Sequence, residues 1–212
     1  MKKTNPYLIM MVLMLLFAFG CKQQTREQIT KEVNSRIEKM TVNRLQYPES
    51  YEPISTDISI EKNDKIIYDS DAFSALRDLS QNYDNFHEKC GNDYTSEEAR
   101  EKLNTLKSIV NVLCDRINVI NNNPGDLECI NAYHQFYAND RSGQKVKKGY
   151  HYIIHKDKSI TLLCDHEEFL RIQTFAMKLL NEPPYTCPWD SVEQELFSPI
   201  AEAWKSGEAN SK

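Results

Sequence analysis

Cysteine and histidine are the residues in this sequence that could act as nucleophiles or hold a transition metal. Cys164 and His166 lie two residues apart at the end of a predicted strand, and they could share an ion with His134 or His155. His151 is four residues from His155, but a strand rises about 3.3 Å per residue, so these two imidazoles would lie roughly 13 Å apart. That spacing is too wide for one ion. We predict that the chain holds no metal and that these are ordinary strand residues.

A cysteine activated by a histidine is the other chemistry open to these side chains. Cys129 or Cys164 together with His134 has the residue types of such a pair. No nucleophile elbow, oxyanion loop or third residue accompanies the pair, and the 6 glycines show no G-x-G spacing for a phosphate loop. We therefore predict no catalytic residue and no cofactor, and we keep a thiol- or metal-dependent hydrolase as the alternative function.

The first 20 residues are predicted to be a signal peptide rather than part of the fold. Lys2 and Lys3 form a short basic start, and an apolar run over residues 7–19 follows. The run is too short to span a bilayer as a stable helix, but it matches the hydrophobic region of a signal peptide. Residues 1–20 are therefore expected to be removed on export.

The apolar run ends in a motif that resembles a bacterial lipobox, in which a peptidase cuts before a lipidated cysteine. Gly20 and Cys21 match that motif, whereas Ala18 and Phe19 are similar to the looser form found in lipoproteins of the Bacteroidetes. We predict that Cys21 carries acyl chains such as palmitate and that residues 21–30 form a polar tether. At about 0.8 kcal/mol per buried CH₂, three acyl chains make the anchoring effectively permanent. An uncleaved anchor or an ordinary secretory signal is the alternative.

The residues after the cysteine indicate where the lipoprotein resides. Lys22-Gln23-Gln24 contains neither the Asp that retains some lipoproteins in the inner membrane nor an acidic run of the kind that sends others to the surface. We predict an outer-membrane lipoprotein that faces the periplasm, with the cell surface as the alternative. Removal of Lys2 and Lys3 lowers the 26 basic side chains to 24 against 31 acidic ones, a net charge of −7. That balance argues against nucleic acid or an anionic bilayer surface as a partner.

The cysteines other than Cys21 also bear on redox state. They are Cys90, Cys114, Cys129, Cys164 and Cys187. An odd number outside the cytoplasm requires at least one free thiol or an intermolecular bond. No C-x-x-C occurs, which argues against redox catalysis. Cys114 lies in the apolar stripe of a predicted helix and is expected to be a buried small hydrophobe.

Four segments have the composition of strands. Residues 129–138, 149–155 and 159–164 are rich in β-branched and aromatic side chains and are separated by polar turns, a pattern typical of an antiparallel meander. An earlier segment, residues 54–61, alternates apolar and polar side chains. The apolar-face residues of this earlier strand are Ile54, Thr56, Ile58 and Ile60.

Helical periodicity marks the segments around these strands. Residues 28–46 predict one amphipathic helix, because apolar side chains recur along a narrow face, and Pro48 ends it. Two helices over residues 69–123 are predicted to form an antiparallel hairpin around Cys90-Gly91-Asn92. Their apolar stripes are interpreted as core, and a partner-binding limb at the outer end of the hairpin is the alternative.

Three helix starts carry capping signals. Thr95-Ser-Glu-Glu98 is a predicted capping box. In it the Thr95 hydroxyl accepts the backbone N–H of Glu98, and the Glu98 carboxylate accepts the backbone N–H of Thr95. Asp165 and Asp190 are predicted to cap two helices after the meander, and residues 206–212 form a polar tail. Ser191 follows in a segment that resembles the O-glycosylation acceptor of exported Bacteroidetes proteins, although the helix cap explains the same residues.

Two short motifs carry a resemblance to a known group. Pro48 and residues 50–53 match a P-x-S-Y-E-P segment, and a later H-x-F-x-A-x-N-x-x-G segment begins at His134. The other matching residues of the later part are Phe136, Ala138, Gly143, Tyr150 and Tyr152. Together they resemble small Bacteroidetes lipoproteins of unknown function, over roughly half of the mature chain. Asp140 follows Asn139, and Tyr137 stands where an Arg or Lys usually precedes the Ala. The resemblance implies a fold and a location, but no mechanism.

These elements together predict an α+β fold. The N-terminal helix is expected to pack across a four-stranded antiparallel sheet within a single domain over residues 31–205. The helical hairpin, residues 69–123, is inserted between the first strand and the meander, and further helices follow the sheet. This order resembles cystatin or NTF2-like proteins. The alternative is a helical bundle with a small three-stranded sheet on one side.

The first meander strand has two different faces, because side chains alternate along a strand. His134 and Phe136 lie on a mostly apolar face that should pack on the N-terminal helix, with His134 held by a backbone or tyrosine partner. Tyr133 and Tyr137 lie on the other face, where aromatic rings with a polar tip suit ligand contact. We predict a non-enzymatic cell-envelope lipoprotein that binds a protein or glycan. Convergence of the candidate histidines and Cys164 in one pocket would favour the enzyme instead.

Overall fold

The computed structural model describes residues 26–61, 66–122, 129–180 and 189–210. Within these ranges the chain is α+β, with one four-stranded antiparallel sheet and five α-helices, so the predicted class is confirmed. The chain divides after Met40 into an N-terminal unit and a larger unit that begins at Thr41. The predicted signal peptide and Cys21, the predicted lipidation site, lie outside the described residues.

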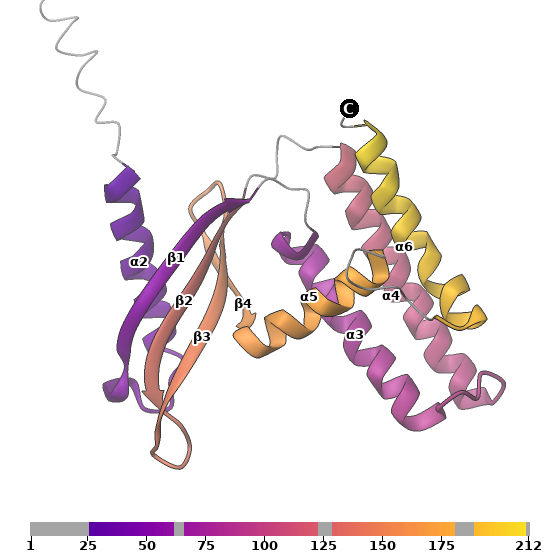
Figure 1. Ribbon diagram of the computed structural model, residues 1–212, viewed down its shortest axis with the longest axis horizontal. Coiled ribbons are helices and arrows are strands. Elements are labelled where there is room, and N and C mark those ends of the chain that lie inside the picture. Colours follow the sequence, from indigo (N-terminus) through magenta and orange to yellow (C-terminus); the bar gives the residue numbers. More distant parts are fainter. Residues whose placement is uncertain (1–25, 62–65, 123–128, 181–188, 211–212) are drawn as a thin grey trace, which may run out of the picture. The chain divides into compact units, whose positions relative to one another are not determined.

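The sheet is a meander in which the strands lie side by side in chain order (Figure 1). Its strands are β1 (Glu52–Glu61), β2 (Cys129–Asn139), β3 (Lys145–Ile154) and β4 (Ile160–Asp165). All three neighbouring pairs are antiparallel. β3 begins four residues earlier than predicted, because pairing with β2 continues as far as Asn139 and Lys145.

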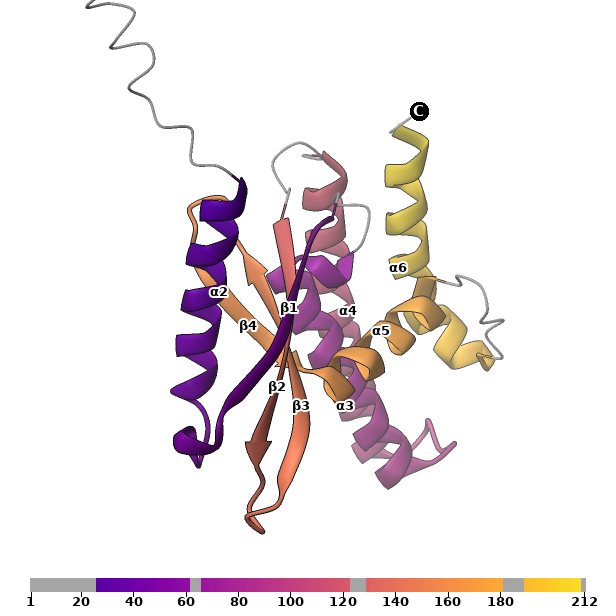
Figure 2. The ribbon, with the colours of Figure 1, turned by 60° about the vertical axis from the view of Figure 1, so that its left-hand side comes forward.

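The strands of this sheet differ in length at one end. The last pair between β3 and β4 joins Tyr150 to Asp165, and the chain turns into a helix at His166. Residues 145–149 of β3 therefore pair with β2 but with no described strand on their other side. Figure 2 shows the β2–β3 hairpin running on past the point where β4 ends. Among the described strands, this stretch of β3 is therefore an open sheet edge, in addition to the outer edges of β1 and β4.

The first strand contains an irregularity that changes one predicted face. The register of β1 against β2 shifts between Pro53 and Ser55, so Ile54 is an extra residue opposite no single partner. Such a bulge rotates the strand locally. Ile54 is 42% exposed, whereas Thr56 and Ile58 remain half-buried. The prediction that Ile54 shares their face is wrong because alternation assumes a regular strand.

The N-terminal helix, α2 (Arg26–Val42), begins two residues and ends four residues earlier than predicted, so residues 26–30 of the predicted tether are helical. Its buried described side chains are Val33, Ile37 and Thr41, spaced four apart, which is the period of one helix face. After Val42 the chain makes turn hydrogen bonds, with the N–H of Arg44 donating to the carbonyl of Thr41. A short 3₁₀ helix, η1 (Pro48–Ser50), then leads into β1.

The predicted helical hairpin is confirmed as α3 (Ser70–Cys90) and α4 (Glu97–Asn122), which pack against each other. A 3₁₀ turn, η2 (Ile66–Tyr68), precedes it. Asp69 caps α3 by accepting the N–H groups of Asp71 and Ala72. The same carboxylate accepts two hydrogen bonds from the Arg116 guanidinium on α4, at 2.8 and 2.6 Å. One side chain therefore both starts the first helix and joins it to the second.

The start of α4 corrects the predicted capping box by one residue. Ser96 is the capping residue, because its hydroxyl oxygen accepts the N–H of Ala99 at 3.3 Å. The Thr95 hydroxyl instead donates to the carboxylate of Asp93 at 2.8 Å. Asp93, which lies upstream of the helix, therefore binds the Thr95 hydroxyl that the predicted capping box would use. The Thr-x-x-Glu spacing alone does not reveal this competition.

The last two helices, α5 (His166–Leu180) and α6 (Ser191–Asn210), complete one core with the hairpin. α6 packs along α4, and α5 contacts β3 and β4 (Figure 1). The sheet contributes Ile153 and Leu163 to this core. The fully buried helix side chains include Leu76, Leu79, Leu113, Ile117, Ile172 and Ile200. The hairpin stripes are therefore core, as interpreted from the sequence.

The start of α6 is held by a capping box and by contacts to α3. The carboxylate of Asp190 accepts the N–H groups of Val192 and Glu193, and Glu193 in return accepts the N–H of Asp190 at 3.1 Å. The other oxygen of Glu193 accepts a hydrogen bond from the Tyr83 hydroxyl and bonds Nε2 of His87 at 2.9 Å. The buried carboxylate is thereby fully satisfied.

Candidate functional site

His134, the first candidate from the sequence, lies enclosed in the sheet with both ring nitrogens engaged. Its Nε2 hydrogen-bonds the hydroxyl of Tyr51 at 2.8 Å, and its Nδ1 hydrogen-bonds that of Thr56 at 2.8 Å. Burial lowers the pKa of the imidazole below its ordinary value. The tyrosine partner expected from the sequence is present. Neither nitrogen can hold a metal or take a proton from a thiol without giving up a buried hydrogen bond.

The two faces of β2 differ in burial. Phe136 is fully buried beside His134, at 0% exposure. Its neighbour Tyr137 is 39% exposed, and Tyr133 is half-buried. The packed and accessible faces of this strand are therefore the ones that alternation predicts, except that Asn131 on the tyrosine face is buried.

The remaining candidates are dispersed rather than brought together. Nε2 of His155 hydrogen-bonds the Thr161 hydroxyl at 2.9 Å, near the turn between β3 and β4. Cys164 packs against the helical core, and burial, with the carboxylates of Asp165 and Glu168, raises the pKa of its thiol to about 12. Among the described residues, no group of three His, Cys, Asp or Glu side chains is placed to hold a metal ion.

His166 joins a cluster that sequence reasoning missed. Its Nδ1 lies 3.0 Å from Nε2 of His151, and both rings lie beside the ring of Tyr133. His151 also stacks on Phe169, with 3.8 Å between ring centroids. His151 is 5% exposed, and burial, with the charge of His166 second, lowers its pKa to about 4. The strand register would have revealed this cluster, because it pairs Tyr133 with His151.

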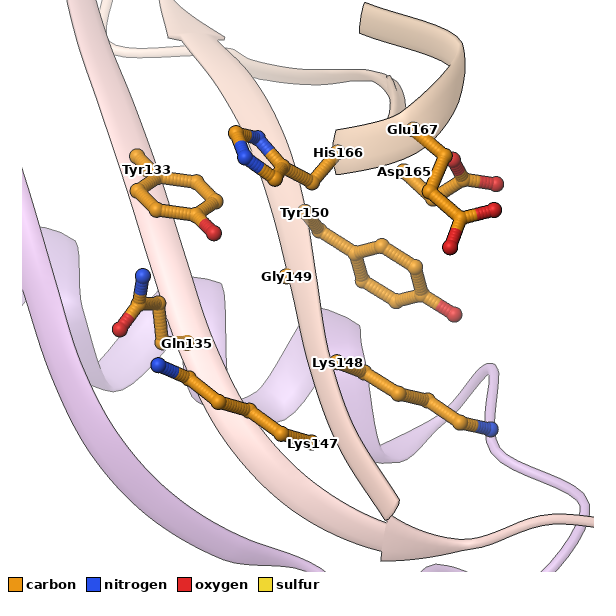
Figure 3. Close-up of a pocket in the computed structure, with 9 residues that line it drawn as sticks. All are labelled: Tyr133, Gln135, Lys147, Lys148, Gly149, Tyr150, Asp165, His166 and Glu167. Carbon is orange, nitrogen blue, oxygen red and sulfur yellow. The ribbon is translucent and has the colours of Figure 1, made fainter. Parts of the chain in front are cut away.

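Two members of this cluster, Tyr133 and His166, line a groove of about 600 Å³ at the open edge of the sheet (Figure 3). The lining residues come from β2, β3 and the junction of β4 with α5. They are Tyr133, Gln135, Lys147, Lys148, Gly149, Tyr150, Asp165, His166 and Glu167. Tyr133, one of the two residues predicted for a ligand face, thus lines a real concavity, whereas Tyr137 does not line it.

The floor of the groove depends on a glycine. A Cβ built on Gly149 would lie 2.6 Å from Cε2 and 2.7 Å from Oη of Tyr133, far inside normal contact. The tyrosine ring therefore lies directly on the glycine backbone of the next strand, as aromatic side chains often do across a sheet. This contact fixes the ring and leaves its hydroxyl pointing into the groove (Figure 3).

Charge is divided between the two ends of the groove. Asp165 and Glu167 lie where β4 passes into α5, and Lys147 and Lys148 lie along β3 (Figure 3). Neither lysine forms an ion pair with another described residue, although the carboxylate of Asp140 lies close enough to Lys148 for their charges to interact. The groove therefore offers a negative end, a positive end and an aromatic wall between them.

The predictions for the cysteines and for Ser191 are only partly addressed by the described residues. The side chains of Cys129 and Cys187 lie outside the described residues, and Cys90, Cys114 and Cys164 are free thiols. Ser191 is exposed at the first position of α6. No helix among the described residues is both long and apolar enough to cross a membrane.

Comparison with known proteins found no matching family model, no similar curated protein and no similar solved structure.

Proposed function

We propose that this chain is a non-enzymatic lipoprotein of the cell envelope, and that its folded domain binds a partner through the groove beside Tyr133. The observation that carries the proposal is the fixed ring of Tyr133 next to two lysines that form no ion pair with any residue the structure describes. Binding sites combine a preformed apolar or aromatic surface with a few polar groups that set orientation. The groove has both.

The electrostatics of the thiol and imidazole groups favour binding over hydrolysis. A cysteine nucleophile reacts as the thiolate, and a pKa of about 12 keeps Cys164 protonated at neutral pH. Both ring nitrogens of His134 are hydrogen-bonded, one to the hydroxyl of Tyr51 and the other to that of Thr56. The alternative hydrolase would need an activated thiol next to a free base, and no observation favours it.

Labelling in cells tests whether the groove is the binding surface. A photo-crosslinking amino acid at Gln135, an uncharged residue that lines the groove, should capture a partner from the envelope. The same residue at Lys107, which is exposed on α4, is the matched control and should not capture that species. Equal capture at both positions, or none at Gln135, would show that the groove is not the site.

The anchor is proposed from the lipobox-like segment that ends at Cys21. Cys21→Ser removes the thiol that would be acylated, so the full-length precursor is expected to accumulate or to be released from the membrane fraction. Detergent phase partitioning of wild type and variant measures this, with Cys90→Ser as the control that should stay anchored. Unchanged partitioning of the Cys21 variant would contradict the lipoprotein proposal and the outer-membrane location with it.

A cystatin-like or NTF2-like arrangement of α2 on the sheet is also a proposal. It is supported by the hydroxyl of Thr41, which hydrogen-bonds that of Tyr152 on β3 at 2.7 Å, close to the end of α2. The four-residue spacing of Val33 and Ile37 before Thr41 supports the same arrangement. If it holds, the face of the sheet opposite the groove is covered, and binding is confined to the groove side.

A further inference from the structure

The open edge of β3 points to a specific class of ligand. We propose that the groove binds a short peptide in an extended conformation, which adds to the sheet as a strand beside β3. This inference rests on the proposed binding function and deepens it by naming the ligand.

The first support is the unpaired length of β3. Residues 145–149 pair with β2 on one side and face no described strand on the other. In an antiparallel sheet, N–H and C=O groups alternate between the two neighbours, so part of this stretch presents backbone groups outward. An open edge of this kind is a template for another strand. Five residues correspond to about 16 Å of peptide.

The second support is where β4 stops. The chain leaves the sheet at His166, so α5 does not continue along β3. The groove begins at this point, between the first turn of α5 and the free part of β3 (Figure 3). A bound strand would therefore occupy the line that β4 vacates, with the ring of Tyr133 beneath one of its side chains.

The charges set the direction and composition of that strand. A peptide that continues the line of β4 would run antiparallel to β3, starting near Asp165 and Glu167 and ending beside Lys147 and Lys148. A free amino group then lies near the carboxylates, and acidic side chains lie near the lysines. Lysines on an edge also discourage pairing with basic or neutral strands, which makes the edge selective. The ligand class is a short peptide, acidic toward its carboxyl end.

A synthetic peptide tests this directly with the full-length protein in detergent. The probe has a free amino end, a central alternation of Thr and Val, two Glu residues before the carboxyl end and a fluorescent label at that end. Fluorescence anisotropy is expected to show saturable binding. Methylating alternate backbone nitrogens of the probe should weaken binding at least tenfold, because those N–H groups can no longer pair with β3.

Charge reversal in the protein is a second test of the peptide proposal. The double variant Lys147→Glu and Lys148→Glu should weaken the probe at least tenfold, whereas Lys107→Glu on α4 should leave its affinity unchanged. Equal affinity for the methylated and unmethylated probes, or no binding at millimolar concentration, would overturn the peptide inference. Capture of a partner at Gln135 in cells without peptide binding overturns this inference alone. Loss of that capture overturns the proposed function as well.

Discussion

Phe136→Ala is expected to lower the free energy of unfolding by roughly 3–5 kcal/mol, the usual cost of truncating a fully buried phenylalanine. Phe136 is at 0% exposure, and its ring centroid lies 5.5 Å from that of Tyr51, 5.6 Å from that of His134 and 5.2 Å from that of Tyr150. The truncated side chain would leave a cavity among rings that the sheet holds in place. Urea denaturation followed by circular dichroism measures the change.

Tyr137→Ala is the matched control, because it removes a larger ring from the next residue on the opposite face. Tyr137 is 39% exposed, and Nζ of Lys145 lies 5.2 Å from the centroid of its ring. Such a cation–π interaction is worth about 0.5–1 kcal/mol at an exposed site. We expect a loss of no more than about 1 kcal/mol. If Tyr137→Ala costs as much as Phe136→Ala, the assignment of the two faces of β2 is wrong.

Acid is expected to destabilise the fold by roughly 3 kcal/mol between pH 6.5 and pH 4, through His151. Its pKa is lowered to about 4 by burial and then by His166, whereas an unfolded histidine titrates near 6.5. Between these values the unfolded chain binds a proton that the folded chain does not. Stability is therefore fully present above pH 6.5 and is lost as pH falls toward 4. His134, whose pKa burial also lowers, adds to the loss in the same direction.

A variant isolates the contribution of His151. His151→Phe keeps an aromatic ring between Tyr133 and Phe169 but cannot take up a proton, so its stability should fall less steeply with pH. His155→Gln, at the exposed turn next to Thr161, should keep the wild-type slope. Chemical denaturation at a series of pH values gives these slopes. A His151→Phe slope equal to that of wild type would assign the acid sensitivity to other groups.

The sequence predicted the elements well where periodicity is strong. Alternation in residues 129–138 identifies β2 and its packed face, and the stripe that includes Leu113 identifies α4 as core. Helix caps at Asp165 and Asp190 are also confirmed, since their carboxylates accept helix N–H groups. These features are local, so the amino-acid order alone determines them.

The groove could not be predicted in the same way. Lys145-Val-Lys-Lys148 has no apolar alternation, so the first half of β3 resembles a turn until β2 is aligned with it. The meeting of Tyr133, His151 and His166 follows from the register of two strand pairs and from the residue at which β4 ends. Each of these is set by tertiary pairing rather than by local pattern.

The two roles of Glu193 have a consequence for how the C-terminal region unfolds. One oxygen of this carboxylate completes the first turn of α6, and the other bonds Tyr83 and His87 on α3. Fraying of the helix start and separation of the two helices therefore break the same group of hydrogen bonds. The beginning of α6 should open and close in native-state hydrogen exchange together with α3, as one cooperative unit, rather than melt from its own end.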